Sequence, residues 1–253
     1  MPIKDIFKDA LNFFHLRSNF YFLMSVLYVG IFFLFELLPG NNLYLSYSTR
    51  YEGTYSSLDY FITLIYLIYD VFFISFCAVW IHNTFILGHV IINKIFIKKF
   101  IRYSIFLFLL SLIIEKTFIS GLLLHFARTD SIDIFFNFLL VAYIFFMIPG
   151  IVIFGFLIFF WLLYLPNLAL GDGISFFKFF KLSKGYRWSF FKILLIQFLI
   201  VIPFFLLDFW LLNKPILIAN ILGRFGDILL ALFIITCISS LYKKFRKEVL
   251  NLD

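Results

Sequence analysis

The chain has 253 residues, of which 64% are hydrophobic and 14% are charged. A water-soluble domain carries charge on roughly a quarter of its residues, whereas the charges here lie in clusters between long uncharged runs. These facts exclude an ordinary soluble domain and predict an all-α, polytopic integral membrane protein. A transmembrane β-barrel is also excluded, because the apolar runs lack the alternation of barrel strands.

The net charge of +7 would suggest a nucleic-acid partner in a soluble protein. Here Lys and Arg flank the apolar runs, as topology determinants do, so no nucleic-acid partner is expected. Cys77 and Cys237 lie within apolar runs. Burial there favours the thiol, so they are expected to be packing residues, neither disulfide partners nor metal ligands.

Residues 1–19 place apolar side chains at helical spacing opposite charged ones. This pattern predicts an amphipathic helix at the membrane surface, and an inward extension of the first span is the alternative interpretation. The whole chain is predicted to be a single integral membrane domain, a helical bundle over residues 1–253. Its six predicted transmembrane helices cover residues 20–38, 60–82, 103–126, 134–165, 189–212 and 225–242.

The fourth predicted span, residues 134–165, is an uncharged run interrupted by Pro149-Gly150. A single helix of that length would measure about 48 Å, longer than the roughly 30 Å hydrocarbon core. The run is therefore one kinked span or a hairpin of two short spans. A hairpin would put the basic residues that follow it opposite the other basic segments, so a single span kinked at Pro149 is predicted.

Sixteen of the 21 Lys and Arg residues lie in four segments: residues 1–19, 94–102, 178–192 and 243–247. The positive-inside rule places such segments in the cytoplasm. The sequence therefore predicts a multi-pass protein of the cytoplasmic (inner) membrane with both termini cytoplasmic.

Ionisable residues inside the predicted spans are candidates for function, because a charge is costly there. The candidate cluster among them is Asp70 in the second span with Glu115 and Lys116 in the third. Asp70 and Lys116 are offset by only about 5 Å along the membrane normal, within the reach of a lysine stem. An interhelical pair that fixes packing is the favoured interpretation, and a polar path or proton relay is the functional one.

Enzyme signatures such as a nucleophile elbow, a zinc motif or a phosphate-binding loop do not occur in this sequence. No catalytic, cofactor-binding or metal-binding residue is predicted. His82 and His89 are expected at the membrane interface, too far apart along a helix to share a metal. Gly171-Asp172-Gly173 is interpreted as a turn signal.

Residues 174–184 combine Phe with a basic stripe at helical spacing, and Arg187-Trp188 mark the interface at the start of the fifth span. This pattern predicts a second interfacial amphipathic helix, whose aromatic rings enter the headgroup boundary while its cations meet anionic lipid. An ordinary basic loop is the alternative. The candidate contacts with lipid or a partner are Lys178, Lys181, Lys184, Arg187 and Trp188.

The same region carries a resemblance. The residues concerned are Pro166-Asn167, Gly171 and the run Lys181-Leu182-Ser183-Lys184-Gly185-Tyr186-Arg187-Trp188. This pattern resembles a recurrent segment of the YciC-like family of bacterial inner-membrane proteins, and of the related membrane domain found beside glycerophosphodiester phosphodiesterases. The chain departs from it at Phe179, where Ser is frequent, and at Tyr186, where Asn is common. The resemblance implies location and architecture but no catalytic residues.

The function expected from these features is that of a non-enzymatic accessory or scaffold protein that contacts anionic lipid headgroups, a membrane-protein partner or a second copy. The alternative is a transporter or channel subunit for a lipid or small solute. Its polar path would lie near Asp70, Glu115 and Lys116, with Pro149 as a hinge. A lipid-modifying enzyme is a third option.

Overall fold

The computed structural model describes residues 3–36, 57–90, 92–114, 164–189, 191–193, 195–196 and 217–252. Within these ranges the chain is helical and contains no strand, as the sequence predicts. The elements are α1 (Ile3–Leu16), α2 (Ser18–Glu36), α4 (Ser57–Leu87), α5 (Lys94–Ile114), α8 (Phe176–Leu182), the 3₁₀ helix η2 (Ser183–Tyr186) and α10 (Leu217–Val249). Residues 164–170 form a further helical stretch.

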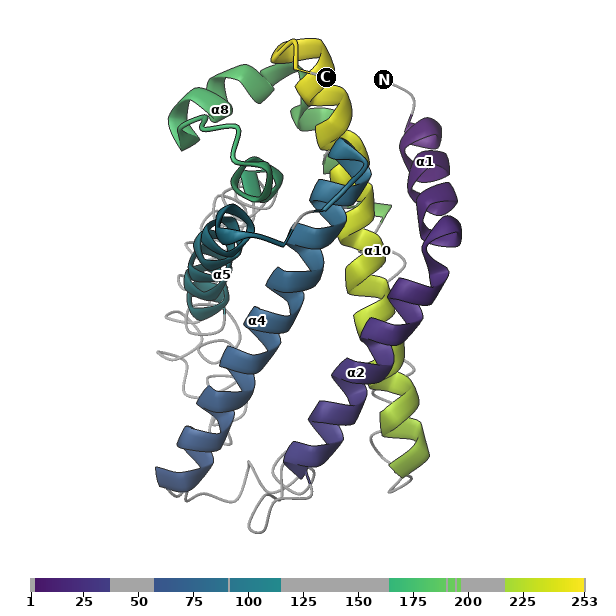
Figure 1. The fold of residues 1–253 in the computed structure, drawn as a ribbon, viewed down its shortest axis with the longest axis vertical. Coiled ribbons are helices and arrows are strands. Elements are labelled where there is room, and N and C mark those ends of the chain that lie inside the picture. Colours follow the sequence, from purple (N-terminus) through teal and green to yellow (C-terminus); the bar gives the residue numbers. More distant parts are fainter. Residues whose placement is uncertain are drawn as a thin grey trace, which may run out of the picture.

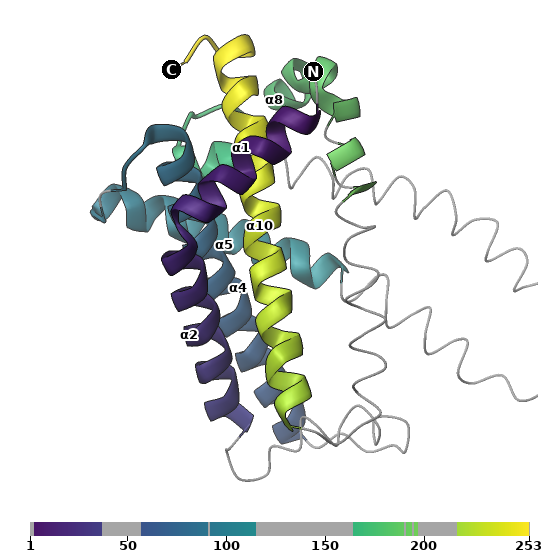
Figure 2. The same cartoon turned by 90° about the vertical axis from the view of Figure 1, so that its right-hand side faces the viewer.

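Three long helices, α2, α4 and α10, run along the length of the molecule (Figure 1). α10 packs against α4, α2 and α1, and α5 packs against α4. Figure 2 shows α5 running across these helices instead of along them. The N and C ends lie at the same end of the molecule, together with α8 (Figures 1 and 2).

The N-terminal segment is a separate helix and does not continue α2 in a straight line. α1 and α2 meet at Arg17 with a bend of 75°. The side chains of Ile6 and Ala10 are fully buried in α1, which packs against α10. The amphipathic helix is thus present, but this part of its apolar face contacts protein, whereas contact with the membrane surface was predicted. Leu11 and Leu16 are the large apolar side chains of α1 that remain exposed.

Two helices among the described residues are long and apolar enough to cross a membrane, over Leu67–Leu87 of α4 and Ile221–Val249 of α10. The bent pair α1–α2 meets the same test when it is taken as one unit, which gives up to three. α4 has 31 residues and α10 has 33, so they measure about 46 and 50 Å. Both exceed the roughly 30 Å hydrocarbon core, so each would extend beyond it.

The helix boundaries differ from the predicted spans for identifiable reasons. α4 continues past residue 82 to Leu87 and ends at Gly88, whose φ of +80° is a left-handed C-terminal cap. α10 continues past residue 242 to Val249 through the basic tail. Lys and Arg end an apolar run, but they are good helix formers and are favoured near a helix C-terminus.

The remaining predicted spans are only partly described. α5 covers the start of the third span up to Ile114, and it is not among the helices that meet the test for crossing a membrane. Residues 115–126 lie outside the described residues, as does the fourth span with Pro149 except for residues 164–165. For the fifth span, residues 189, 191–193 and 195–196 are described and are helical.

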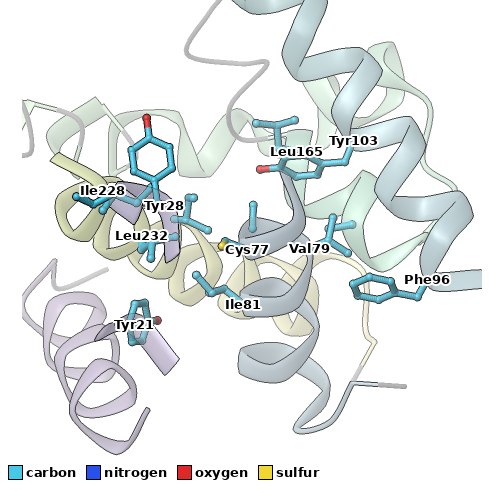
Figure 3. Packing of buried hydrophobic residues seen from close by; sticks show 14 residues of the cluster. Tyr21, Tyr28, Cys77, Val79, Ile81, Phe96, Tyr103, Leu165, Ile228 and Leu232 are labelled. Carbon is cyan, nitrogen blue, oxygen red and sulfur yellow. The ribbon is translucent and has the colours of Figure 1, made fainter. Parts of the chain in front are cut away.

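Two clusters of buried side chains hold the described helices together. The first joins α2, α4, α5 and α10 around Cys77 and Leu232 (Figure 3). The second lies at the end of the molecule that carries both termini, and we call this assembly the end cap. Cys237, the other cysteine, is buried in it. The buried core of the end cap consists of Ile6, Ala10, Ile86, Leu170, Phe179, Ile193, Cys237, Ile238, Leu241, Tyr242 and Phe245.

Candidate functional site

The helix α8 is anchored to the end cap by one phenylalanine. Phe179 is 1% exposed, and its ring lies 6.1 Å from that of Tyr242 and 5.1 Å from that of Phe245. Phe176 and Phe180 pack at the edge of the same core. These three rings therefore contact protein, whereas the aromatic residues of this stretch were predicted to contact lipid. Phe177 is the exception, with 80% of its surface exposed.

The opposite side of this segment is basic. The three lysines of the predicted stripe, Lys178, Lys181 and Lys184, are all exposed. No Asp or Glu occurs in the sequence from Gly173 to Ile196. We call Phe177 and these three lysines the basic face. The predicted stripe of lysines is therefore on the surface, and the surrounding sequence contains no carboxylate to neutralise it.

Arg187 and Trp188 differ in their surroundings from the basic face. The Nη2 group of Arg187 donates to the Phe180 carbonyl at 2.6 Å, and the guanidinium lies 4.1 Å from the centre of the Phe180 ring. Arg187 thus ties the end of η2 back to α8. Trp188 is 65% exposed and stacks on Phe191 at 5.4 Å. Arg187 acts as an internal tie, whereas Trp188 is on the surface.

A turn with two left-handed glycines precedes α8. Gly171 and Gly173 have φ values of +76° and +71°, which favour glycine strongly. They place Asp172 so that its carboxylate accepts a hydrogen bond from Tyr242 Oη at 2.9 Å and forms an ion pair with Arg246 Nε at 3.4 Å. The Asp172 and Arg246 side chains are only 6% and 12% exposed. The turn that the sequence predicts is thus also a link between the α8 segment and α10.

Lys99 of α5 lies beside this turn. Its Cε atom is 3.0 Å from the position that a Cβ atom on Gly171 would take. Burial lowers the pKa of the Lys99 ammonium, the Asp172 carboxylate opposes this shift and the Arg246 charge adds to it. Lys99 of α5 and Arg246 of the C-terminal tail therefore both lie near the Asp172 carboxylate.

Asn167, one of the residues that carry the resemblance, fixes the chain before α8. Its Nδ2 donates to the Ile174 carbonyl at 3.0 Å, and its backbone carbonyl accepts from Gly171 N at 2.9 Å. Tyr164 Oη donates to the same Ile174 carbonyl at 2.8 Å. Asn83 of α4 donates to the Ala169 carbonyl at 3.2 Å. The turn is thereby bound to α4 as well as to α10.

The end of η2 is tied to the end of α10. The Tyr186 hydroxyl donates to the Glu248 carboxylate, and the Tyr186 ring lies 5.4 Å from that of Phe245. Burial raises the pKa of the Tyr186 phenol above its ordinary value, and the Glu248 charge raises it further. The phenol therefore keeps its proton and acts as a donor.

Of the predicted intramembrane cluster, only Asp70 lies within the described residues; Glu115 and Lys116 lie outside them. The Asp70 carboxylate accepts a hydrogen bond from Tyr28 Oη at 2.7 Å, which joins α4 to α2. The guanidinium of Arg224 in α10 lies 4.9 Å from the Phe32 ring, and its charge acts on the Asp70 carboxylate. Tyr28, a partner of Asp70 in the structure, is not among the residues predicted from the sequence.

Two further polar contacts join α10 to the other long helices. His82 is 1% exposed, and its Nδ1 lies 2.7 Å from Ser239 Oγ. Because the Ser239 hydroxyl donates to the Ile235 carbonyl, the imidazole is the donor in this pair. Tyr21 Oη lies 2.6 Å from Thr236 Oγ1. His82, expected at the interface, is therefore buried between helices, whereas His89 is exposed.

The geometry defines a class of protein. In the ranges that the structure describes, the protein is helical, with two helices suited to span a membrane, or up to three if the bent pair α1–α2 is one span, and with an end cap that carries a basic face. Within the described ranges, no group of three or more His, Cys, Asp or Glu could hold a metal ion. Comparison with protein-family models, with curated proteins and with solved structures finds no match to this chain.

Proposed function

We propose that this chain is a non-enzymatic, six-span protein of the cytoplasmic membrane that acts as an accessory or scaffold protein. Its resemblance to the YciC-like family is part of this proposal. Both ends of the chain lie at the end of the molecule that carries α8 (Figure 1), and the basic tail of α10 is there too. This arrangement supports a cytoplasmic end cap, because positive residues favour that side of the membrane.

The observation that carries the scaffold proposal is the way in which polar side chains of the long helices pair with one another. Tyr28 bonds Asp70, His82 bonds Ser239, and Tyr21 bonds Thr236, each across two different helices. Paired polar groups of this kind fix helix packing, since each removes an unsatisfied group from an apolar surrounding. A path for a solute needs polar groups that face water or the solute.

The transport alternative keeps one specific observation in its favour. Asp70 is a carboxylate in a helix suited to span a membrane, with the charge of Arg224 acting on it. Under that alternative, Asp70 would line a path with Glu115 and Lys116, and Pro149 would act as a hinge. Ionisable groups at such positions mark substrate or ion paths in many membrane proteins.

One experiment separates the two functions. Asp70→Asn and Tyr28→Phe are each purified, reconstituted into proteoliposomes and tested for stability and for leakage or flux of a panel of solutes. The scaffold proposal predicts that both variants lower stability, because Tyr28→Phe removes the donor of the interhelical bond and Asp70→Asn replaces its charged acceptor by a weaker amide oxygen. Flux that is present in the parent protein and abolished only by Asp70→Asn, with stability unchanged, would establish the transport alternative instead.

The contact surface under this proposal is the basic face. Covalent capture from native membranes tests it, with a photoreactive amino acid placed at the exposed Phe177 position and, as a control, at the buried Phe179 position. A specific crosslinked product only from position 177 is expected. The same products from both positions would contradict a defined contact surface.

A further inference from the structure

We infer that the basic face binds the anionic phospholipid headgroups of the leaflet around the end cap, with Phe177 inserted between them. This inference rests on the proposed function, because it names the ligand of the contact surface. The ligand class is a lipid surface with net negative charge. A protein partner is a different outcome, which the experiments below distinguish.

The depth of α8 along the molecule supports this assignment. In α10, residues 228–242 carry no charge and the basic tail starts at Lys243, so the membrane–water boundary falls near that point. The ring of Phe179 contacts those of Tyr242 and Phe245, on either side of Lys243. α8 is therefore level with the transition from apolar to basic residues, which is the depth of the headgroups.

The orientation of α8 supports it as well. Phe179 points into the core of the end cap, and the exposed lysines and Phe177 project from the rest of the helix surface. Buried packing thus fixes which residues face outwards, so the basic face is held in place without a ligand. A preformed surface loses less conformational entropy on binding than a mobile loop would.

Charge and side-chain type favour lipid over an acidic protein. The basic face has three lysines, and the sequence around it from Gly173 to Ile196 has no carboxylate, so it offers no opposite charge with which a mixed protein surface would pair. The Phe177 ring is 80% exposed and lies beside the lysines. This combination suits the headgroup boundary, because the ring can contact the upper acyl chains while the ammonium groups bind lipid phosphates. Trp188, 65% exposed a few residues further on, is also of a type enriched at that boundary.

The first test measures lipid preference. The full chain is reconstituted in nanodiscs of phosphatidylcholine with phosphatidylglycerol, and the lipids retained on the released protein are counted by native mass spectrometry. The parent protein should retain phosphatidylglycerol preferentially. In the variant Lys178→Gln/Lys181→Gln/Lys184→Gln, the preference for phosphatidylglycerol over phosphatidylcholine should fall about fivefold for each lysine removed. The total reduction should be on the order of a hundredfold.

A control variant matches the change in net charge. Lys4, Lys8 and Lys247 are also exposed, on α1 and α10, and their replacement by Gln should leave most of the preference intact. Equal loss in the two triple variants would overturn the inference, because the effect would then come from net charge. No preference for phosphatidylglycerol in the parent protein would overturn it too.

The second test measures insertion and remains informative if the triple variant folds poorly. A fluorophore is attached to Phe177→Cys in a chain that lacks the native cysteines. Its emission should be quenched by phospholipids brominated near the headgroup, and a fluorophore on the control variant Lys247→Cys should be quenched less. Equal quenching at the two positions would contradict insertion.

The failure of this inference is distinguishable from the failure of the scaffold proposal. If the parent protein shows no anionic-lipid preference, while the lysine variant loses a crosslinked protein from native membranes, the basic face is a protein-docking surface. That result overturns the lipid inference and leaves the scaffold function in place. Solute flux through the parent protein would instead contradict the scaffold function. The lipid inference would then still be decided by the nanodisc and quenching results.

Discussion

Removal of the Asp172 carboxylate should release the link between the α8 segment and α10. The carboxylate is 6% exposed and accepts from Tyr242 Oη at 2.9 Å and from Arg246 Nε at 3.4 Å. A hydrogen bond to a charged group contributes about 1.5–3 kcal/mol, and the longer contact with Arg246 contributes less than the shorter one. We therefore expect Asp172→Ala to lower the free energy of unfolding by about 2–3 kcal/mol and Tyr242→Phe by about 1.5 kcal/mol.

Because the two changes remove the same bond, their effects should not add. Reversible unfolding in mixed micelles, measured for both single variants and the double variant, should give a coupling energy of about 1–1.5 kcal/mol. Asp9→Ala, which removes an exposed carboxylate from α1, should change stability by less than about 0.5 kcal/mol. A coupling energy below about 0.3 kcal/mol would refute the reasoning, since independent sites add to within that margin.

Three further variants test other parts of the end cap and the helix contacts by the same unfolding assay. Gly171→Ala should cost about 1–2 kcal/mol because φ is +76° there, whereas Gly185→Ala, with nothing within 4 Å of the added Cβ atom, should cost less than about 0.5 kcal/mol. Phe179→Ala should cost about 3 kcal/mol because a fully buried ring is lost, and an equal cost for the exposed Phe177→Ala would contradict the assigned orientation of α8. Ser239→Ala should cost about 0.6 kcal/mol, typical of a hydrogen bond between membrane helices; no measurable loss would show that its bond with the imidazole is not a stabilising contact.

The helices of this chain could be predicted where a long apolar run decides the outcome. α4 and α10 cover the predicted second and sixth spans for that reason, and α2 covers the first as far as Glu36. The ends of α4 and α10 could not be predicted, because the end of an apolar run marks where a membrane span ends but not where the helix ends. Polar and charged residues such as Lys and Arg can continue the helix. Beyond residue 242, α10 also buries Phe245 in the end cap, a tertiary contact that the local sequence does not reveal.

The candidate site was predicted only in outline. Sequence spacing gave the lysines of the basic face, but it could not tell which phenylalanine faces inwards, since aromatic residues occur on several sides of α8. The role of Asp172 was missed, because its partners Tyr242 and Arg246 lie 70 or more residues further along the chain. The sequence signal for Asp172 is its position as a single carboxylate between two glycines, directly before a long stretch without Asp or Glu.

Labelling of single cysteines from each side of the membrane tests the central claim most directly. In a background with Cys77→Ala and Cys237→Ala, cysteines are placed at the exposed positions Lys4, Lys181 and Lys247, on α1, α8 and α10, and treated with a membrane-impermeant maleimide. A single end cap on the cytoplasmic face predicts that all three react only after the cells are permeabilised. Reaction of position 181 from the outside, with position 247 protected, would contradict that arrangement.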